Sequence, residues 1–241
     1  MNHPVHRLAC IAVLLAPGLA RAAEIDSIDQ LAQAEFRTLS RDIAAAVSFK
    51  PLNASEATGL AGFALGFNVG ATRIGNESVL VKAAGGDDVP AAIPYAGVRL
   101  HKGLPFNLDV GVSYHTLPGT GVRATGGEIR WAVLPGSVVL PAIALRATAA
   151  SLSGVDNLRI RTHGYDVSIS KGFAFVTPYV GVGRVHGRSS APGVSTLTPE
   201  SFDLDKWFAG VDFSLGLTHL AVETDRTGDA RSYGFRVGLH F

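Results

Sequence analysis

The chain has 241 residues, of which 47% are hydrophobic and 17% charged, and its formal net charge at pH 7 is +1. Its mean hydropathy of +0.25 is high for a soluble protein, yet no long uninterrupted apolar run follows the first twenty or so residues. An ordinary helical membrane protein is excluded, because each span needs about 20 apolar residues. A disordered chain is excluded by high hydrophobicity and low charge. The composition favours β-structure in which apolar residues alternate with polar ones.

Residues 1–22 have the properties of a cleaved signal peptide. Arg7 precedes an apolar segment over residues 8–19, and Ala20-Arg21-Ala22 places small residues where a signal peptidase cuts. Cys10 as a lipoprotein acylation site is the weaker alternative, because Arg7 stands where an apolar residue is needed. Cleavage removes the only cysteine and leaves 19 basic and 20 acidic residues. The mature protein is therefore expected to lack disulfides, and it has no charge excess for nucleic acid.

Residues 24–49 are expected to form an amphipathic helix. Ser27 and Gln30 have the spacing of a capping box, and Pro51 is expected to end the helix. The apolar residues that recur at helical spacing are Ile28, Leu31, Ala32, Phe36, Leu39, Ile43 and Val47. We interpret residues 23–56 as a periplasmic amphipathic helix and linker. The alternative is a plug or lid for the domain that follows.

Residues 57–241 alternate with a period of two, which is typical of strands with one apolar and one polar or small face. Each segment is about as long as a tilted strand that crosses a bilayer. The ten predicted strands cover residues 60–72, 90–102, 105–116, 121–134, 139–151, 158–171, 174–186, 203–215, 217–226 and 231–241.

The connections alternate between short turns and longer loops, as in outer-membrane barrels with short periplasmic turns and long extracellular loops. The polar face holds too little charge for a soluble surface. Aromatic residues gather near both sets of strand ends, with Trp131 and Phe241 at one and Trp207 and Tyr233 at the other. The predicted fold class is an all-β, antiparallel, up-and-down transmembrane β-barrel of about ten strands preceded by a short helix. Eight and twelve strands remain alternatives.

Two stretches carry a family resemblance. The chain ends on an alternating pattern that resembles the C-terminal strand of bacterial outer-membrane barrels: Tyr233, Phe235, Val237, Leu239 and Phe241. The stretch Thr177-Pro178-Tyr179-Val180-Gly181-Val182-Gly183 resembles a strand of small barrels of the OmpA/OmpX/OmpW type. The resemblance implies a Gram-negative outer-membrane location, recognition of the last strand by the barrel-assembly machinery, contact with outer-membrane lipid and lipopolysaccharide, and a monomer.

The inward face is predicted to carry five positive and five negative side chains: Arg99, Arg130, Arg146, Lys206 and Arg236 with Asp109, Glu128, Asp166, Asp212 and Glu223. Glu128 is expected nearly opposite Arg146, and Glu223 nearly opposite Arg236. Isolated buried charge is costly, so a salt-bridged network that fills the lumen is the preferred interpretation. A pore is the alternative, because inward glycines leave room: Gly66, Gly70, Gly111, Gly181 and Gly183.

Four outward arginines are predicted at extracellular strand ends: Arg123, Arg159, Arg161 and Arg184. Guanidinium groups at that depth can form paired hydrogen bonds with phosphate, so these residues are candidates for lipopolysaccharide contact. Ordinary solvation near loops is the alternative interpretation.

Catalysis has weak candidates only. Asp87, Asp88 and His186 are the residues available for an Asp–His pair at the extracellular mouth, and Ser113 and His115 share one strand face. No motif joins them, and no spacing typical of a metal or cofactor site occurs. The expected function is a non-enzymatic envelope protein, either structural or a small-solute channel. The alternatives are an outer-membrane enzyme that acts on lipopolysaccharide or peptide, and an adhesin that uses loops 73–89 and 187–202.

Overall fold

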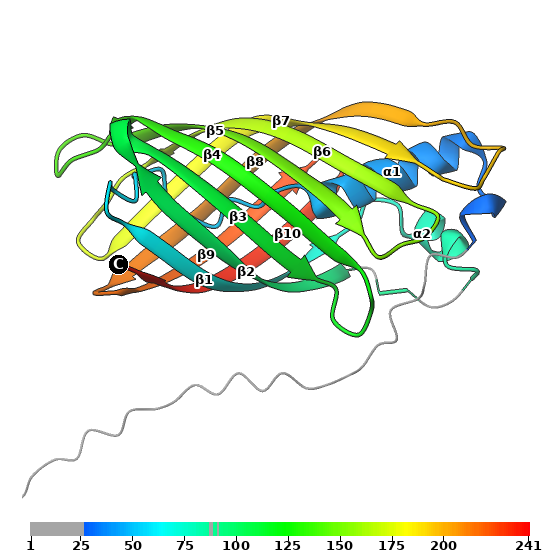
Figure 1. Ribbon diagram of the computed structural model, residues 1–241, viewed down its shortest axis with the longest axis horizontal. Coiled ribbons are helices and arrows are strands. Elements are labelled where there is room, and N and C mark those ends of the chain that lie inside the picture. Colours follow the sequence, from blue (N-terminus) through cyan, green and yellow to red (C-terminus); the bar gives the residue numbers. More distant parts are fainter. Residues whose placement is uncertain (1–26, 87–88, 91) are drawn as a thin grey trace, which may run out of the picture.

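The computed structural model describes residues 27–86, 89–90 and 92–241. The predicted signal peptide and the pair Asp87 and Asp88 lie outside these residues. Ten antiparallel strands form a closed barrel in which each strand pairs with its neighbours in the chain and β1 pairs with β10 (Figure 1). The prediction of an up-and-down barrel with about ten strands is confirmed.

Most strands begin and end within three residues of their predicted bounds. The exception is β7, which continues four residues further than expected; its neighbour β8 begins three residues earlier than expected. Residues 187–189 pair with residues 200–202, and Ser190 pairs with Arg159 of β6, so the fourth loop shrinks to residues 191–199. The strands are β1 Phe63–Arg73, β2 Ala92–Leu104, β3 Leu108–Thr116, β4 Arg123–Pro135, β5 Ala142–Ser153, β6 Arg159–Ser170, β7 Val176–Ser190, β8 Glu200–Leu215, β9 Thr218–Thr227 and β10 Ala230–His240.

The two ends of the barrel differ. β1 begins and β10 ends at the same rim, which carries the C-terminus and the short connections after the even strands (Figure 1). The opposite rim, called the mouth below, carries the connections after the odd strands. The first of these contains an unexpected short helix, α2 (Glu77–Ala83). The last is the tight turn at residues 228–229, so long loops are not a property of every connection at the mouth.

Large apolar side chains cover the middle of the outer wall. Phe67 is 53% exposed, Ile129 57% and Val182 55%, although such residues are normally buried in soluble proteins. The alternate positions of the same strands face inward and are polar or glycine. This is the apolar outer band and polar interior of a transmembrane barrel. Among the described helices, none has the length and hydropathy of a membrane span.

The N-terminal helix is shorter than predicted. A single 3₁₀ turn, η1 (Ile28–Gln30), precedes α1 (Gln33–Val47). The predicted capping box at Ser27 and Gln30 is wrong, because the Ser27 side chain makes no capping hydrogen bond. The Glu35 carboxylate instead accepts a hydrogen bond of 2.8 Å from the Ala32 amide at the start of α1. The helix also ends four residues before Pro51.

Helix α1 lies inside the mouth (Figure 1). Its apolar stripe packs against the inner faces of β6, β7 and β8 and against α2, and Phe36 and Leu39 are almost fully buried there. The strand residues of this core are apolar, among them Leu158, Ile160, Phe202 and Leu204. This position corresponds to the plug or lid alternative of the sequence analysis.

After α1 the chain runs the length of the lumen. Residues 48–58 leave the mouth, pass through the interior and reach the opposite rim, where β1 begins (Figure 1). Along this path they contact inward side chains of β2, β3, β4, β5, β6, β8 and β9. We call residues 48–58 the threading segment. The threading segment therefore fills space in which a pore would otherwise run.

Candidate functional site

All ten charged side chains predicted to face inward are buried, each with a relative exposure of 7% or less. The structure adds one more pair, Lys50 from the threading segment and Asp225 from β9. Asp225 could have been predicted to face inward, because it lies two residues after Glu223 and therefore shares its face. Lys50 could not have been predicted to do so, because it lies in the segment interpreted as a linker. With both added, the strands and the threading segment carry six positive and six negative buried groups among the described residues.

The strongest attachment of the threading segment is at Lys50. Its Nζ atom donates hydrogen bonds to Asp225 Oδ1 at 2.6 Å and to the Ala45 carbonyl at 2.8 Å. Lys206 Nζ lies 3.7 Å from the other Asp225 oxygen and donates to the Phe49 carbonyl. Two ammonium groups thus share one carboxylate and fix the end of α1 to the wall.

Further along the lumen, wall side chains bind the backbone of the threading segment. The Arg99 guanidinium donates to the carbonyls of Lys50 and Pro51 and lies over the Phe49 ring. The Glu223 carboxylate accepts hydrogen bonds from the Leu52 amide at 2.6 Å and from the Tyr179 hydroxyl at 2.9 Å. Buried backbone groups need such partners, and the inward charges supply them.

The segment's last residues are held in the same way. Arg130 donates to Asp109 at 2.9 Å and to the Ala54 carbonyl at 2.7 Å. The Ser55 hydroxyl donates to Ser168 Oγ at 2.9 Å, and the Thr58 amide donates to Asp109 at 3.0 Å. The wall and the threading segment therefore form one continuous polar network.

Two pairs of opposite charges were predicted to lie nearly opposite each other on neighbouring strands. Glu128 and Arg146 are two positions out of register, yet Arg146 Nε lies 2.9 Å from Glu128 Oε2. Arg146 also lies 3.8 Å from Asp166. Glu223 and Arg236 are likewise two positions out of register, but they form no ion pair with each other, because Arg236 donates to Asp212 at 2.8 Å and Glu223 is occupied as described above. The positions of residues on neighbouring strands give no indication that the threading segment binds Glu223 instead.

The inward glycines do not leave a pore. At Gly181, a Cβ atom would lie only 2.2 Å from the Phe208 ring, and at Gly70 it would lie 2.4 Å from the Tyr95 hydroxyl. The missing side chains make room for these two rings. Together with the threading segment, the rings support the interpretation of a filled lumen.

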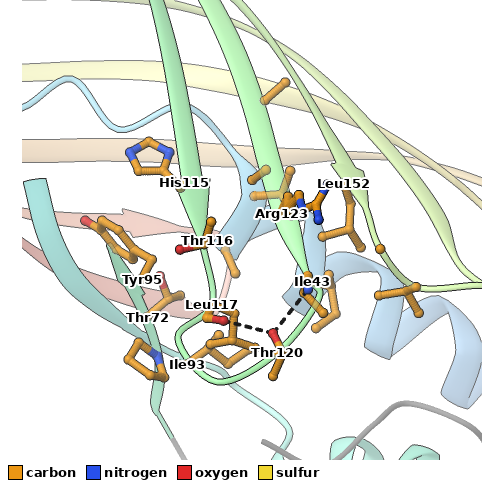
Figure 2. Close-up of a pocket in the computed structure, with 18 of the residues that line it drawn as sticks. Ile43, Thr72, Ile93, Tyr95, His115, Thr116, Leu117, Thr120, Arg123 and Leu152 are labelled. Atoms are coloured by element: carbon orange, nitrogen blue, oxygen red, sulfur yellow. Dashed lines mark hydrogen bonds between the residues drawn. The ribbon is translucent and has the colours of Figure 1, made fainter. Parts of the chain in front are cut away.

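A cavity of about 480 Å³ opens at the mouth between α1 and strands β2 to β5 (Figure 2). Its walls are largely apolar, with Ile43, Ile93, Leu117 and Leu152 among the lining residues. Thr120 bridges the β3–β4 loop by hydrogen bonds to the Leu117 carbonyl and from the Val122 amide. The volume is in the range of small-molecule pockets.

Ser113 and His115, the paired candidates of β3, both line this cavity. The His115 ring contacts the Asn68 side chain and packs edge-on against Tyr95, with ring centroids 5.4 Å apart. These neighbours are an amide and a phenol, not the carboxylate that a hydrolytic histidine needs. The contacts with Asn68 and Tyr95 hold the His115 ring in place at the floor of the apolar cavity.

The polarity of the wall inverts at the mouth. In the membrane zone, outward Val182 and Trp207 are apolar, and inward Asp166 and Lys206 are charged. Further towards the mouth, beginning two residues beyond Val182 and Trp207, the inward residues are the apolar ones of the α1 core and the outward residues are polar. These outward residues are Arg159, Arg161 and His163 on β6, Arg184, His186 and Arg188 on β7, and Ser201, Asp203 and Asp205 on β8. The inversion marks the level where hydrocarbon gives way to a polar environment.

Exposed arginines surround the barrel at this level. The four predicted residues Arg123, Arg159, Arg161 and Arg184 are all exposed, and Arg123 also lines the cavity at the mouth. Arg161 lies directly opposite Arg188, whereas Arg184 forms an ion pair of 3.0 Å with Asp205. The sequence reasoning missed the arginines on the other side of the barrel. Cross-strand register places Arg73, Arg231 and Arg226 side by side on β1, β10 and β9.

Two carboxylates of α1 lie outside the membrane-spanning strands. Lys82 of α2 donates to Glu35 and lowers the pKa of that carboxyl below its ordinary value. Burial raises the pKa of Asp42, although Asn76 donates two hydrogen bonds to this carboxylate and lowers it in part. Both residues attach α1 to the first loop, so the docking of the plug depends on their ionisation.

The closed antiparallel barrel, its even strand number, apolar outer band and polar interior together define an outer-membrane β-barrel protein. No protein-family model and no curated protein sequence matches the chain. Among solved structures, it is similar to the N-terminal β-barrel domain of Pseudomonas aeruginosa OprF, at 14% identity over 74% of this chain and 97% of that chain, with a TM-score of 0.34. It is also similar to LpxR from Salmonella typhimurium, at 9% identity over 73% and 99%, with a TM-score of 0.37. Likeness at this level concerns the barrel fold alone.

Proposed function

We propose that this protein is an outer-membrane barrel that is closed to passive diffusion and binds anionic lipid, in particular lipopolysaccharide, around its mouth. The mouth faces the cell exterior, because the opposite rim carries the barrel termini and the short turns typical of the periplasmic side. The observation that carries the proposal is the ring of exposed arginines at the level where the outer wall changes from apolar to polar.

The chemistry fits phosphate. Arg161 and Arg188 occupy directly opposed positions, and Arg159 is two residues from Arg161 on the same face. Like charges directly opposite each other are unfavourable in a sheet, so an anion between them offsets a repulsion. A guanidinium group binds phosphate through two parallel hydrogen bonds. The outer-leaflet lipopolysaccharide presents phosphate at this height.

Closure of the lumen is the second part of the proposal. The threading segment and the ion pairs described above occupy the interior, which argues against the small-solute channel kept open by the sequence analysis. In planar bilayers the folded protein is expected to give no current steps across many insertions. Regular steps of defined size would contradict closure.

The lipid contact is tested by charge reversal. The Arg159→Glu/Arg161→Glu variant is expected to retain clearly less lipopolysaccharide per barrel after mild detergent extraction than the unaltered protein. The matched control is Lys102→Glu/Lys171→Glu, which changes the same charge at the opposite rim. Equal retention by all three folded proteins would refute the lipopolysaccharide contact.

A further inference from the structure

Three polar side chains on the outer wall of β7 and β8 stand in the order of a hydrolytic triad. His186 Nδ1 lies 3.0 Å from Asp203 Oδ1, and His186 Nε2 lies 3.2 Å from Ser201 Oγ. These contacts follow from register, because His186 is directly opposite Asp203 and Ser201 is the next outward residue on β8. We infer that Ser201, His186 and Asp203 form an ester-hydrolase site on the outer wall of the barrel. The inference rests on the proposed orientation of the mouth towards the outer leaflet.

The geometry assigns a role to each group. A histidine tautomer with its proton on Nδ1 donates to Asp203 and leaves Nε2 free to accept the Ser201 proton. Asp203 orients the ring and stabilises the imidazolium that forms during the reaction. Arg188 is directly opposite Ser201, and we assign its guanidinium the role of donating to the oxygen that becomes negatively charged in the tetrahedral intermediate.

The reaction is balanced with water as the second reactant. Ser201 Oγ bonds to the ester carbonyl carbon while its proton moves to His186 Nε2. The bond from this carbon to the alcohol oxygen then breaks, and the alcohol leaves with that proton. Water adds to the acyl-serine in the same way, giving the carboxylic acid and the free serine.

The position of the site indicates its substrate class. His186 is four residues beyond Val182, which lies opposite Trp207 at the edge of the apolar band. At about 3.3 Å per residue and a strand tilt near 40°, the site lies on the order of 10 Å above that edge. The scissile ester is therefore on the polar headgroup, not at the root of an acyl chain.

The positive charges near Ser201 restrict the substrate class further. Arg188 adjoins Ser201 on one side and Arg161 on the other, so a negatively charged group near the ester is bound next to the nucleophile. His186 and Asp203 have side chains 39% and 59% exposed, which leaves the site open from the lipid side. The substrate we assign is a carboxylic ester on the anionic saccharide headgroup of an outer-leaflet lipid.

The test uses the folded, full-length protein in detergent micelles. A fluorophosphonate probe is expected to label Ser201, located by peptide mass spectrometry, and the His186→Ala variant is expected to lose this label. Carboxylic acid released from purified lipopolysaccharide is expected to fall to background in Ser201→Ala and at least ~100-fold in Asp203→Asn. The control is Ser151→Ala, since Ser151 is also an outward serine near the mouth, hydrogen-bonded to Thr125.

The outcomes separate this inference from the proposed function. Labelling at Ser201 no stronger than at Ser151, or acid release that is unchanged in Ser201→Ala, would overturn the hydrolase site. Neither result affects lipopolysaccharide retention, which Ser201→Ala is expected to preserve. Failure of the Arg159→Glu/Arg161→Glu test would instead remove the lipid contact while leaving the probe reaction at Ser201 intact. Heat-modifiable migration on a gel verifies that each variant is folded.

Discussion

Lys50 offers the sharpest test of how the N-terminal segment is held in the lumen. The Lys50→Ala substitution removes the 2.6 Å ion pair with Asp225 and leaves Asp225 Oδ1 without its partner, whereas the Ala45 carbonyl keeps the hydrogen bond from the Ser48 hydroxyl. Removing one partner of a buried pair costs about 3–5 kcal/mol. Asp225 keeps Lys206 at 3.7 Å and a hydrogen bond from Thr227, so the lower end of that range applies.

A loss of about 3 kcal/mol raises the population with an unseated threading segment by roughly 100-fold, since each 1.4 kcal/mol is a factor of ten. Amide hydrogen exchange in α1 and residues 48–58 measures this opening directly, and peptides from the strands provide an internal reference. Exchange is expected to accelerate by about two orders of magnitude in the segment and little in the strands.

The control is Lys82→Ala, which removes the ion pair with Glu35 at the mouth, where the two side chains are 44% and 32% exposed. Exposed pairs contribute about 0–1 kcal/mol, so exchange in the threading segment is expected to change by less than tenfold. Equal exchange in Lys50→Ala and the unaltered protein would refute the buried attachment.

Two further substitutions probe the docking of α1. Phe36→Ala empties a fully buried position in the core at the mouth. It is expected to weaken the docking of α1 by about 3–5 kcal/mol and to make α1 accessible to protease in folded barrels. An unchanged cleavage rate would contradict this packing. Asp42→Asn keeps an oxygen that accepts from Asn76 but cannot ionise. Burial and the nearby Asp229 raise the pKa of Asp42, so its docking contribution is largest below the ordinary carboxyl pKa of about 4 and is lost as pH rises through the raised value. The protection of α1 in Asp42→Asn is therefore expected to exceed that of the unaltered protein increasingly from pH 4 to pH 8, and a constant difference would contradict the shift.

The barrel was predictable because its signal is repeated in every strand. Outward residues such as Val182 and inward residues such as Asp166 alternate strictly, and a one-residue slip would move each to the wrong environment. The ten inward charges followed from the same alternation. Strand ends were less certain at β7 and β8, where the alternation continues but its polarity inverts as the wall leaves the membrane.

The threading segment was not predictable from local sequence. Residues 48–58 have no strand or helix period, and their partners are distant in the chain: Lys50 binds Asp225, and Ser55 binds Ser168. The triad was missed for a related reason. The sequence offers His186 only Asp87 and Asp88 as acidic partners, and Ser201 falls in the predicted loop 187–202 while Asp203 is the first residue of the predicted strand, so no predicted register joins the three.

A disulfide between the threading segment and the wall tests whether the N-terminal segment occupies the lumen. The mature chain is expected to have no native cysteine, and the hydroxyls of Ser55 and Ser168 are 2.9 Å apart. The Ser55→Cys/Ser168→Cys variant, oxidised in intact outer membranes, is expected to form the 55–168 disulfide nearly completely, as shown by peptide mass spectrometry. The Ser55→Cys/Ser151→Cys control, with its second position on the outer wall, is expected to form none. If the thiols at positions 55 and 168 stay unlinked and open to alkylation in folded barrels, this result would contradict the occupation of the lumen by the N-terminal segment.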